Sequence, residues 1–170
     1  MLPRLLSTPL LAAALLLSVL SCSKKEDDPV AAGPTNVGSY KLDSREPNTG
    51  QVVNRQVEAK AHLVFSTDAN NDEVEVRLTT TPQPAIGVET LILVFAKPKG
   101  QPDTAYRYFG VSLYDGVAPL GLWFMNDRAT ITPTRNGGFS GTFTASRSIM
   151  IGLANQKDYT LEGVFTDVRP

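Results

Sequence analysis

The stretch Val57-Glu-Ala-Lys-Ala-His-Leu-Val-Phe65 alternates apolar and polar side chains almost without interruption. The segment Glu73–Leu78 repeats this pattern, with apolar residues at positions 74, 76 and 78. A period of two is typical of β-strands that bury one face and leave the other in solvent. These two stretches therefore predict that the chain folds mainly as β-sheet.

Other segments also have the composition of strands, being rich in tyrosine, phenylalanine, valine and threonine. Leu91–Ala96 is apolar throughout, which predicts a central strand covered on both faces. Asn136-Gly137 favours a tight hairpin turn before Phe139. We expect an all-β fold, a single antiparallel β-sandwich or small barrel of about eight or nine strands. The remaining predicted strands are Ala105–Tyr114, Leu120–Asn126, Ala129–Thr132, Phe139–Ala145 and Tyr159–Val168.

The amino-terminal part of the chain has a different character. Arg4 precedes the apolar run Leu10–Leu17, and the segment after Cys22 is charged. A basic start, an apolar centre of roughly 7–15 residues and a small residue before cleavage are typical of secretory signal peptides. The apolar run is shorter than the roughly 20 residues that a transmembrane helix needs. We therefore expect residues 1–21 to be a signal peptide.

Val19-Leu20-Ser21-Cys22 resembles the lipobox of bacterial lipoproteins. The resemblance implies cleavage between Ser21 and Cys22, a diacylglycerol on the Cys22 thiol and acylation of the new amino terminus. Two or more acyl chains anchor a protein stably, whereas one binds only marginally. Cys22 is the only cysteine of the chain, so lipidation would also account for a thiol that has no disulfide partner. The first expected partner is therefore a membrane, reached through the lipid.

Residues 22–36 are expected to form a lipidated, flexible tether, because they offer little apolar surface to repay the entropy of ordering. Within them, Lys24-Lys-Glu-Asp-Asp28 resembles the charged export signal of some Gram-negative lipoproteins. That resemblance implies an outer-membrane location with exposure on the cell surface, and the alternative is a solvated spacer. Residues 37–170 have the length of one domain.

A second resemblance concerns the end of the chain. Gly138-Phe-Ser-Gly-Thr-Phe143 and Leu161–Val168 are similar to the closing strands of small uncharacterised bacterial lipoproteins with β-sandwich domains. The resemblance implies a fold class, and that family has no settled activity to transfer.

Composition and motifs give little sign of catalysis. The net charge of −1 offers no electrostatic case for binding nucleic acid. His62 is the only histidine, and its place in the alternating stretch predicts an exposed strand residue. The chain has no Gly-x-Ser-x-Gly nucleophile motif. We expect a non-enzymatic domain without a cofactor.

One segment has the oxygen ligands of a calcium loop. Asp68, Asn70 and Asp72 alternate as such loops require, but Glu73 stands where a glycine is expected and Thr79 where a glutamate is expected. The competing interpretation is a polar hairpin turn. We therefore predict no metal, with these residues as the one calcium candidate.

The aromatic residues provide the remaining candidate site. Tyr106, Tyr108 and Trp123 would form a stacking platform for a sugar or an apolar ligand if they reached the surface on neighbouring strands. The competing interpretation is core packing, since aromatic side chains bury large areas.

These observations favour a lipid-anchored cell-envelope protein whose β-domain binds, or packs against, an envelope protein or a glycan. The first alternative is a lipocalin-like barrel that carries a small apolar ligand in a cavity lined by Phe95, Phe124 and Phe143. The second is a hydrolase whose catalytic residues the sequence pattern does not reveal.

Overall fold

The computed structural model describes residues 33–170 apart from 83, 85–86, 115–120 and 152–154. The predicted signal peptide, Ser21, Cys22 and most of the predicted tether lie outside the described residues. The first strand begins at Val37. Among the described residues, no helix is long and apolar enough to cross a membrane.

The described residues form ten strands and one short 3₁₀ helix, η1 (Asp103–Ala105). All strand pairs are antiparallel and belong to one sheet in the order β6-β5-β4-β3-β2-β1-β10-β9-β7, with β8 paired to β9. The prediction of an antiparallel all-β fold is confirmed. The strands are β1 (Val37–Glu46), β2 (Gln51–Thr67), β3 (Asn71–Thr79), β4 (Thr90–Pro98), β5 (Arg107–Tyr114), β6 (Leu122–Trp123), β7 (Met125–Ala129), β8 (Thr132–Pro133), β9 (Phe139–Ile151) and β10 (Asn155–Val168).

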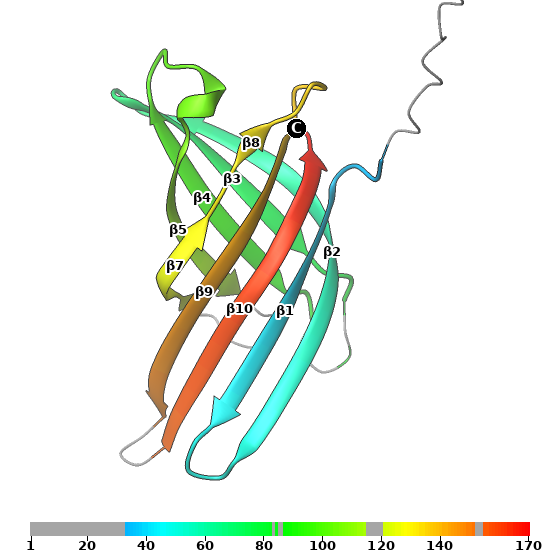
Figure 1. Cartoon of the computed structure of the whole chain (residues 1–170), viewed down its shortest axis with the longest axis vertical. Helices are drawn as coiled ribbons and strands as arrows, with labels where there is room; N and C mark the ends of the chain where they lie inside the picture. Colours follow the sequence, from blue (N-terminus) through cyan, green and yellow to red (C-terminus); the bar gives the residue numbers. More distant parts are fainter. Residues whose placement is uncertain (1–32, 83, 85–86, 115–120, 152–154) are drawn as a thin grey trace, which may run out of the picture. The chain divides into compact units, whose positions relative to one another are not determined.

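The sheet folds back on itself without closing. Figure 1 shows β9, β10, β1 and β2 side by side, with β3, β4 and β5 crossing behind them. The strands β6 and β7 lie at opposite ends of the strand order, yet only Phe124 separates them in sequence. The Phe124 N–H donates to the carbonyl oxygen of Val111 at 3.2 Å. The arrangement is sandwich-like. In place of the two predicted strands Leu120–Asn126 and Ala129–Thr132, the described residues form three short strands, with β6 at one edge of the sheet, β7 at the other and β8 beside β9.

The core fills the space between the two layers. Inward-facing residues of β4, among them Leu91, Leu93 and Phe95, are fully buried. Phe95 meets Phe165 of β10 edge to face, with ring centroids 6.3 Å apart, which joins the two layers. The outward Ile92 and other alternate residues of β4 are only half-buried. The prediction that β4 is covered on both faces is therefore wrong, because one sheet folded over itself covers only its inner face.

The predicted hairpin turn at Asn136-Gly137 is present between β8 and β9. Gly137 has a φ of +78°, a backbone conformation that favours glycine. The Thr134 N–H donates to the Gly138 carbonyl oxygen at 2.8 Å and closes the turn.

Candidate functional site

The structure does not bring the three aromatic residues of the predicted platform onto one surface. Tyr106 is buried and meets Phe139 edge to face at 5.6 Å. Tyr108 packs against the core, and its hydroxyl donates to Asp127 at 2.6 Å, so burial and this hydrogen bond raise its pKa. Trp123 is 56% exposed on the outside of the sheet. Core packing accounts for the two tyrosines, and Trp123 stands apart from them.

The calcium candidate is a polar hairpin turn. The Asp68 Oδ1 atom accepts the backbone N–H groups of Asn70 and Asn71 at 2.7 and 2.6 Å, and these bonds lower the Asp68 pKa. Asp72 instead accepts a hydrogen bond from the Lys97 ammonium at 3.2 Å and one from Thr67 at 3.0 Å. The two carboxylates are engaged by different partners, and a lysine already supplies the positive charge beside Asp72.

Two other sequence predictions concern the exposure of His62 and the cavity that the carrier hypothesis requires. His62 is exposed, as its place in the alternation predicts. Phe95, Phe124 and Phe143, which the carrier hypothesis places around a ligand cavity, are 0%, 6% and 2% exposed and belong to one packed cluster. The interior at these positions is filled by protein side chains.

A buried ionic cluster closes the core at the end of the sheet where β4 begins. The Glu89 side chain is 1% exposed and pairs with the Arg55 guanidinium at 2.7 Å. The Tyr40 hydroxyl donates to the other carboxylate oxygen, and burial together with this bond raises the Tyr40 pKa. The Glu89 backbone is held by Thr80 through two hydrogen bonds of 2.9 Å. Since each carboxylate oxygen has a partner, the cluster ties β1 and β2 to the start of β4.

The opposite end of β4 carries a second internal charge. The Lys97 side chain is 8% exposed and reaches Asp72, the Gln101 carbonyl oxygen at 2.6 Å and the Tyr106 ring at 5.2 Å. Burial opposes its charge, but the hydrogen bond to Asp72 and the surrounding groups outweigh burial and raise the Lys97 pKa. These contacts tie the end of β4 to Asp72 of β3 and to the segment that follows β4.

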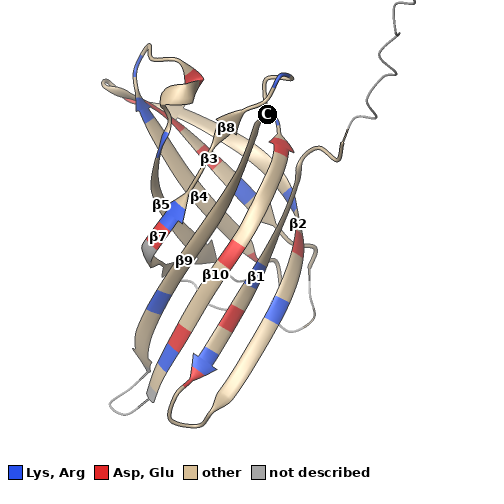
Figure 2. Cartoon of the chain, in the orientation of Figure 1, with Lys and Arg blue, Asp and Glu red and all other residues tan. Residues whose placement is uncertain are grey.

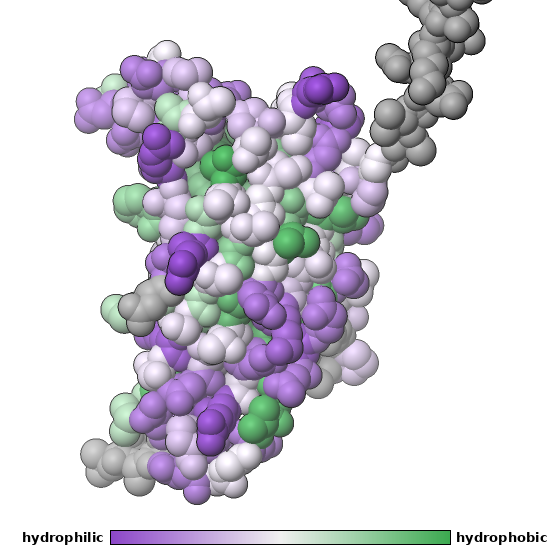
Figure 3. All heavy atoms as spheres, in the orientation of Figure 1, coloured by the Kyte–Doolittle hydropathy of each residue, from purple (hydrophilic) through white to green (hydrophobic). Residues whose placement is uncertain are grey.

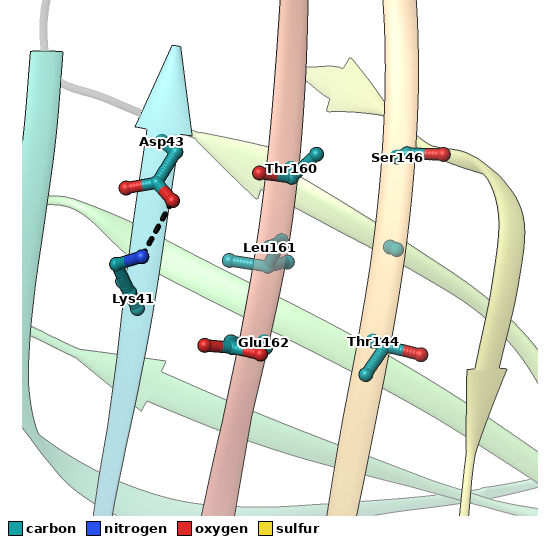
Figure 4. Close-up of a pocket in the computed structure, with 8 residues that line it drawn as sticks. Lys41, Asp43, Thr144, Ser146, Thr160, Leu161 and Glu162 are labelled. Carbon is teal, nitrogen blue, oxygen red and sulfur yellow. Dashed lines mark ion pairs between the residues drawn. The ribbon is translucent and has the colours of Figure 1, made fainter.

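The best candidate for a binding site lies outside the core, on the outer face of β1, β10 and β9. The strand register aligns polar side chains there in rows across the three strands. Lys41 is opposite Glu162, which is opposite Thr144. The next row joins Asp43, Thr160 and Ser146 in the same way. Figure 4 shows these side chains standing in three columns on the sheet.

These two rows line a shallow groove, which we call the polar groove. It has a volume of about 360 Å³ and is continuous with a hollow of about 350 Å³ that shares Lys41, Thr144 and Glu162. The surface around it is mostly hydrophilic, as Figure 3 shows. Acidic and basic residues follow one another along β1 and β10 (Figure 2). The residues lining the first hollow are Lys41, Asp43, Thr144, Ala145, Ser146, Thr160, Leu161 and Glu162.

The charges of the groove are held in place by their neighbours. The Lys41 ammonium lies 2.7 Å from Asp43 Oδ2, and this bond raises the Lys41 pKa. The Oδ1 atom of Asp43 is buried and has no hydrogen-bond partner among the described residues. Beyond the groove, Asp158 accepts hydrogen bonds from Ser148 at 2.6 Å and Gln156 at 2.7 Å, which lower its pKa.

The chemistry of the polar groove suits a ligand with many hydroxyl groups. Serine and threonine hydroxyls both donate and accept, carboxylates accept and the ammonium donates. Neighbouring strands lie about 4.8 Å apart, so the rows offer polar groups at regular intervals over a flat area. Glu162 is exposed, and its carboxylate is open to such a ligand.

The sequence reasoning missed the groove and the Glu89 cluster for different reasons. The groove residues come from three strands, and positions 41–43 are brought to 144–146 and 160–162 only by strand register. By contrast, Glu89 and Lys97 share their parity with Leu91, Leu93 and Phe95. That parity is a local signal for charges at the two ends of a buried face.

Comparison with protein-family models, with curated proteins and with solved structures found no match for this chain.

Proposed function

We propose that this protein is a lipid-anchored cell-envelope protein whose β-domain binds a polyhydroxylated ligand, such as a glycan, without transforming it. The lipobox resemblance at Ser21 and Cys22 supports the anchor. The charged segment Lys24–Asp28 supports an outer-membrane location with the domain outside the cell.

The polar groove carries the binding half of the proposal. It joins hydroxyl, carboxylate and ammonium groups in two aligned rows on one exposed face. Lys41 and Asp43 hold each other at 2.7 Å, so part of the site is ordered before a ligand arrives. Preordered polar groups lower the entropy that binding costs. Its volume of about 360 Å³ lies within the range of small-ligand sites.

The binding test begins with an array of neutral and acidic oligosaccharides, followed by calorimetric titration of the strongest binder. Replacing Thr144 with valine or Glu162 with glutamine should each weaken that binding about tenfold, because one hydrogen bond is lost. Thr166→Val is the matched control, since Thr166 is an exposed threonine of β10 outside the groove lining. Equal affinity in all four proteins would exclude the groove as the binding site.

The anchor is tested separately by growing cells with a labelled fatty acid. The wild-type protein should carry the label and Cys22→Ser should not. Label retained by Cys22→Ser would contradict the anchor and leave the groove untouched.

A further inference from the structure

The outer face of the sheet changes character beyond the polar groove, on β7, which pairs with β9, and on the neighbouring β6 and β5. Three large apolar side chains of β5, β6 and β7 point into solvent: Phe109 is 81% exposed, Met125 70% and Trp123 56%. The outward residues Ile92 and Val94 of the neighbouring β4 are apolar and half-buried. We call Phe109, Trp123 and Met125 the apolar face.

Strand register makes the three exposed residues neighbours. Trp123 pairs with Ser112, and the Phe124 N–H bonds to the Val111 carbonyl oxygen, so the chain continues antiparallel to β5. Met125 therefore follows toward the bulge at Phe109, where the β4–β5 register skips one residue, and on its other side it pairs with Ser146 of β9. A bulge turns its extra side chain away from the ladder. A Cβ added at Gly110 would meet no atom within 4 Å, so the surface beside Phe109 is open.

Arginine side chains border the apolar face. Arg107 and Arg128 are exposed on β5 and β7, and the Arg147 guanidinium of β9 donates to the Trp123 carbonyl oxygen. Asp127 is the first acidic residue after Met125 in the sequence, and its carboxylate accepts a hydrogen bond from the Tyr108 hydroxyl at 2.6 Å. The described charged residues of this border are therefore mostly arginines, and Arg128, which pairs with Thr144, lies where the apolar face meets the polar groove.

We propose that the apolar face rests on a lipid bilayer whose headgroups include anionic phospholipid. Tryptophan, phenylalanine and methionine insert at the boundary between headgroups and acyl chains, while arginine remains with the phosphates. The positive border of the face is complementary to those phosphates. This inference depends on the proposed lipid anchor for its proximity to a membrane.

The tether makes this contact geometrically accessible and favours it. About 14 residues separate Cys22 from Val37, and an extended chain spans up to about 3.5 Å per residue, which gives a reach of roughly 50 Å. A domain held that close to a bilayer meets it at a high effective concentration, so three inserted side chains suffice for contact that would be weak in free solution.

Trp123 is the only tryptophan of the chain and reports on the contact directly. The lipidated full-length protein is reconstituted on vesicles of phosphatidylcholine and phosphatidylglycerol, with bromine on the acyl chains of half the samples. Trp123 emission should shift to shorter wavelength and be quenched by bromine. The double variant Arg107→Glu and Arg128→Glu should reduce the quenching severalfold. Lys60→Glu, which reverses an exposed charge of β2 outside both the polar groove and the apolar face, should leave it unchanged.

Failure of the face and failure of the anchor give different results. Emission that stays at long wavelength, unquenched, in the vesicle-bound lipidated protein would overturn the docking inference. The docking inference would also be overturned if sedimentation at several protein concentrations showed that a second copy of the protein covers Trp123. The Cys22→Ser chain should still be quenched, but only at about 100-fold more lipid, because tethering is lost. Quenching at equal lipid concentrations with and without Cys22 would support the face and contradict the anchor.

Discussion

The polar groove and the apolar face are two parts of the outer surface of one sheet, and both are backed by the same core. The outward positions that line the polar groove on β1, β10 and β9 carry lysine, aspartate, glutamate, serine and threonine, although Val164 and Met150 are also exposed on β10 and β9. Outward positions of β5, β6 and β7 carry phenylalanine, tryptophan and methionine, with arginines around them. Inward positions do not differ in this way, since both layers contribute large apolar residues.

The difference shows that the fold constrains the inward positions of the sheet more strongly than the outward ones. Inward residues must fill one core at close packing, so their chemistry is dictated by the fold. Outward residues on either side support the same sheet whether they are polar or apolar. A large apolar side chain that is 81% exposed, such as Phe109, gains little from the core, and its place beside Trp123 and Met125 is what supports the proposed membrane contact.

The largest effect on stability is expected from a substitution in the core that both faces share. Phe165 is 1% exposed and contacts Phe95 across the two layers. Phe165→Ala should lower the free energy of unfolding by about 3–5 kcal/mol, measured by urea denaturation. Ligand binding at the groove and vesicle contact should both be lost wherever the variant unfolds. A loss below about 1 kcal/mol would mean that the layers do not depend on this contact.

A smaller effect is expected from the buried cluster that links the two layers. Glu89→Ala removes the partner of Arg55 and Tyr40 and should cost about 3 kcal/mol in the same measurement, near the lower end for broken buried pairs because Arg55 is 30% exposed. Tyr40→Phe removes only the hydroxyl and should cost about 1.5–3 kcal/mol. If Tyr40→Phe proved the more harmful of the two, the ion pair would not be the main link.

Two glycines allow the faces to be compared by the same substitution. A Cβ at Gly163, beneath the polar groove, would lie 2.4 Å from the Ser39 carbonyl oxygen and 2.5 Å from Phe143 Cζ. Gly163→Ala should therefore cost about 1–3 kcal/mol and weaken ligand binding at the groove. Gly110→Ala, beside the apolar face, meets open space and should leave stability nearly unchanged. Equal costs at the two sites would contradict the packing described for the sheet.

The smallest expected effect is the contribution of Asp158, on the polar side, to the pH dependence of stability. Hydrogen bonds from Ser148 and Gln156 lower the Asp158 pKa in the folded state. A lowered pKa adds stability above the unfolded value, about 3.9, and this contribution disappears as the pH falls through the folded value. Asp158→Asn should therefore flatten the acid side of a plot of melting temperature against pH. An unchanged acid limb in Asp158→Asn would show that these hydrogen bonds are not maintained in solution.

Most of the strands could be predicted from the sequence because burial on one face leaves a period of two, as residues 57–65 and 73–78 show, but β1 was not predicted. The sequence did not reveal that only one face of β4 is fully buried, because the outward residues of this strand are apolar as well. The bulge at Phe109 and the passage from β6 to β7 depend on contacts with β4, β5 and β9 and leave no local pattern.

The candidate site was less accessible to prediction than the fold. The polar groove exists only because β10 pairs with both β1 and β9, which join distant parts of the chain. Tyr106 and Tyr108 are aromatic residues that could stack against a ligand, yet both pack into or against the core. The sequence shows the chemistry of each side chain, but predicting the face of the sheet on which it lies also requires the strand order.

The most direct test of the two-face account compares the accessibility of one introduced thiol on each face. Met125→Cys and Lys41→Cys are placed separately in the lipidated protein, whose own Cys22 is blocked by its lipid under the proposal. Lys41 lies in the polar groove on β1, which β10 and β9 separate from β7. Each variant reacts with a membrane-impermeant maleimide, with and without phosphatidylcholine–phosphatidylglycerol vesicles. Vesicles should slow the labelling of Met125→Cys severalfold and leave that of Lys41→Cys unchanged. Equal slowing at both positions, or at neither, would contradict the account.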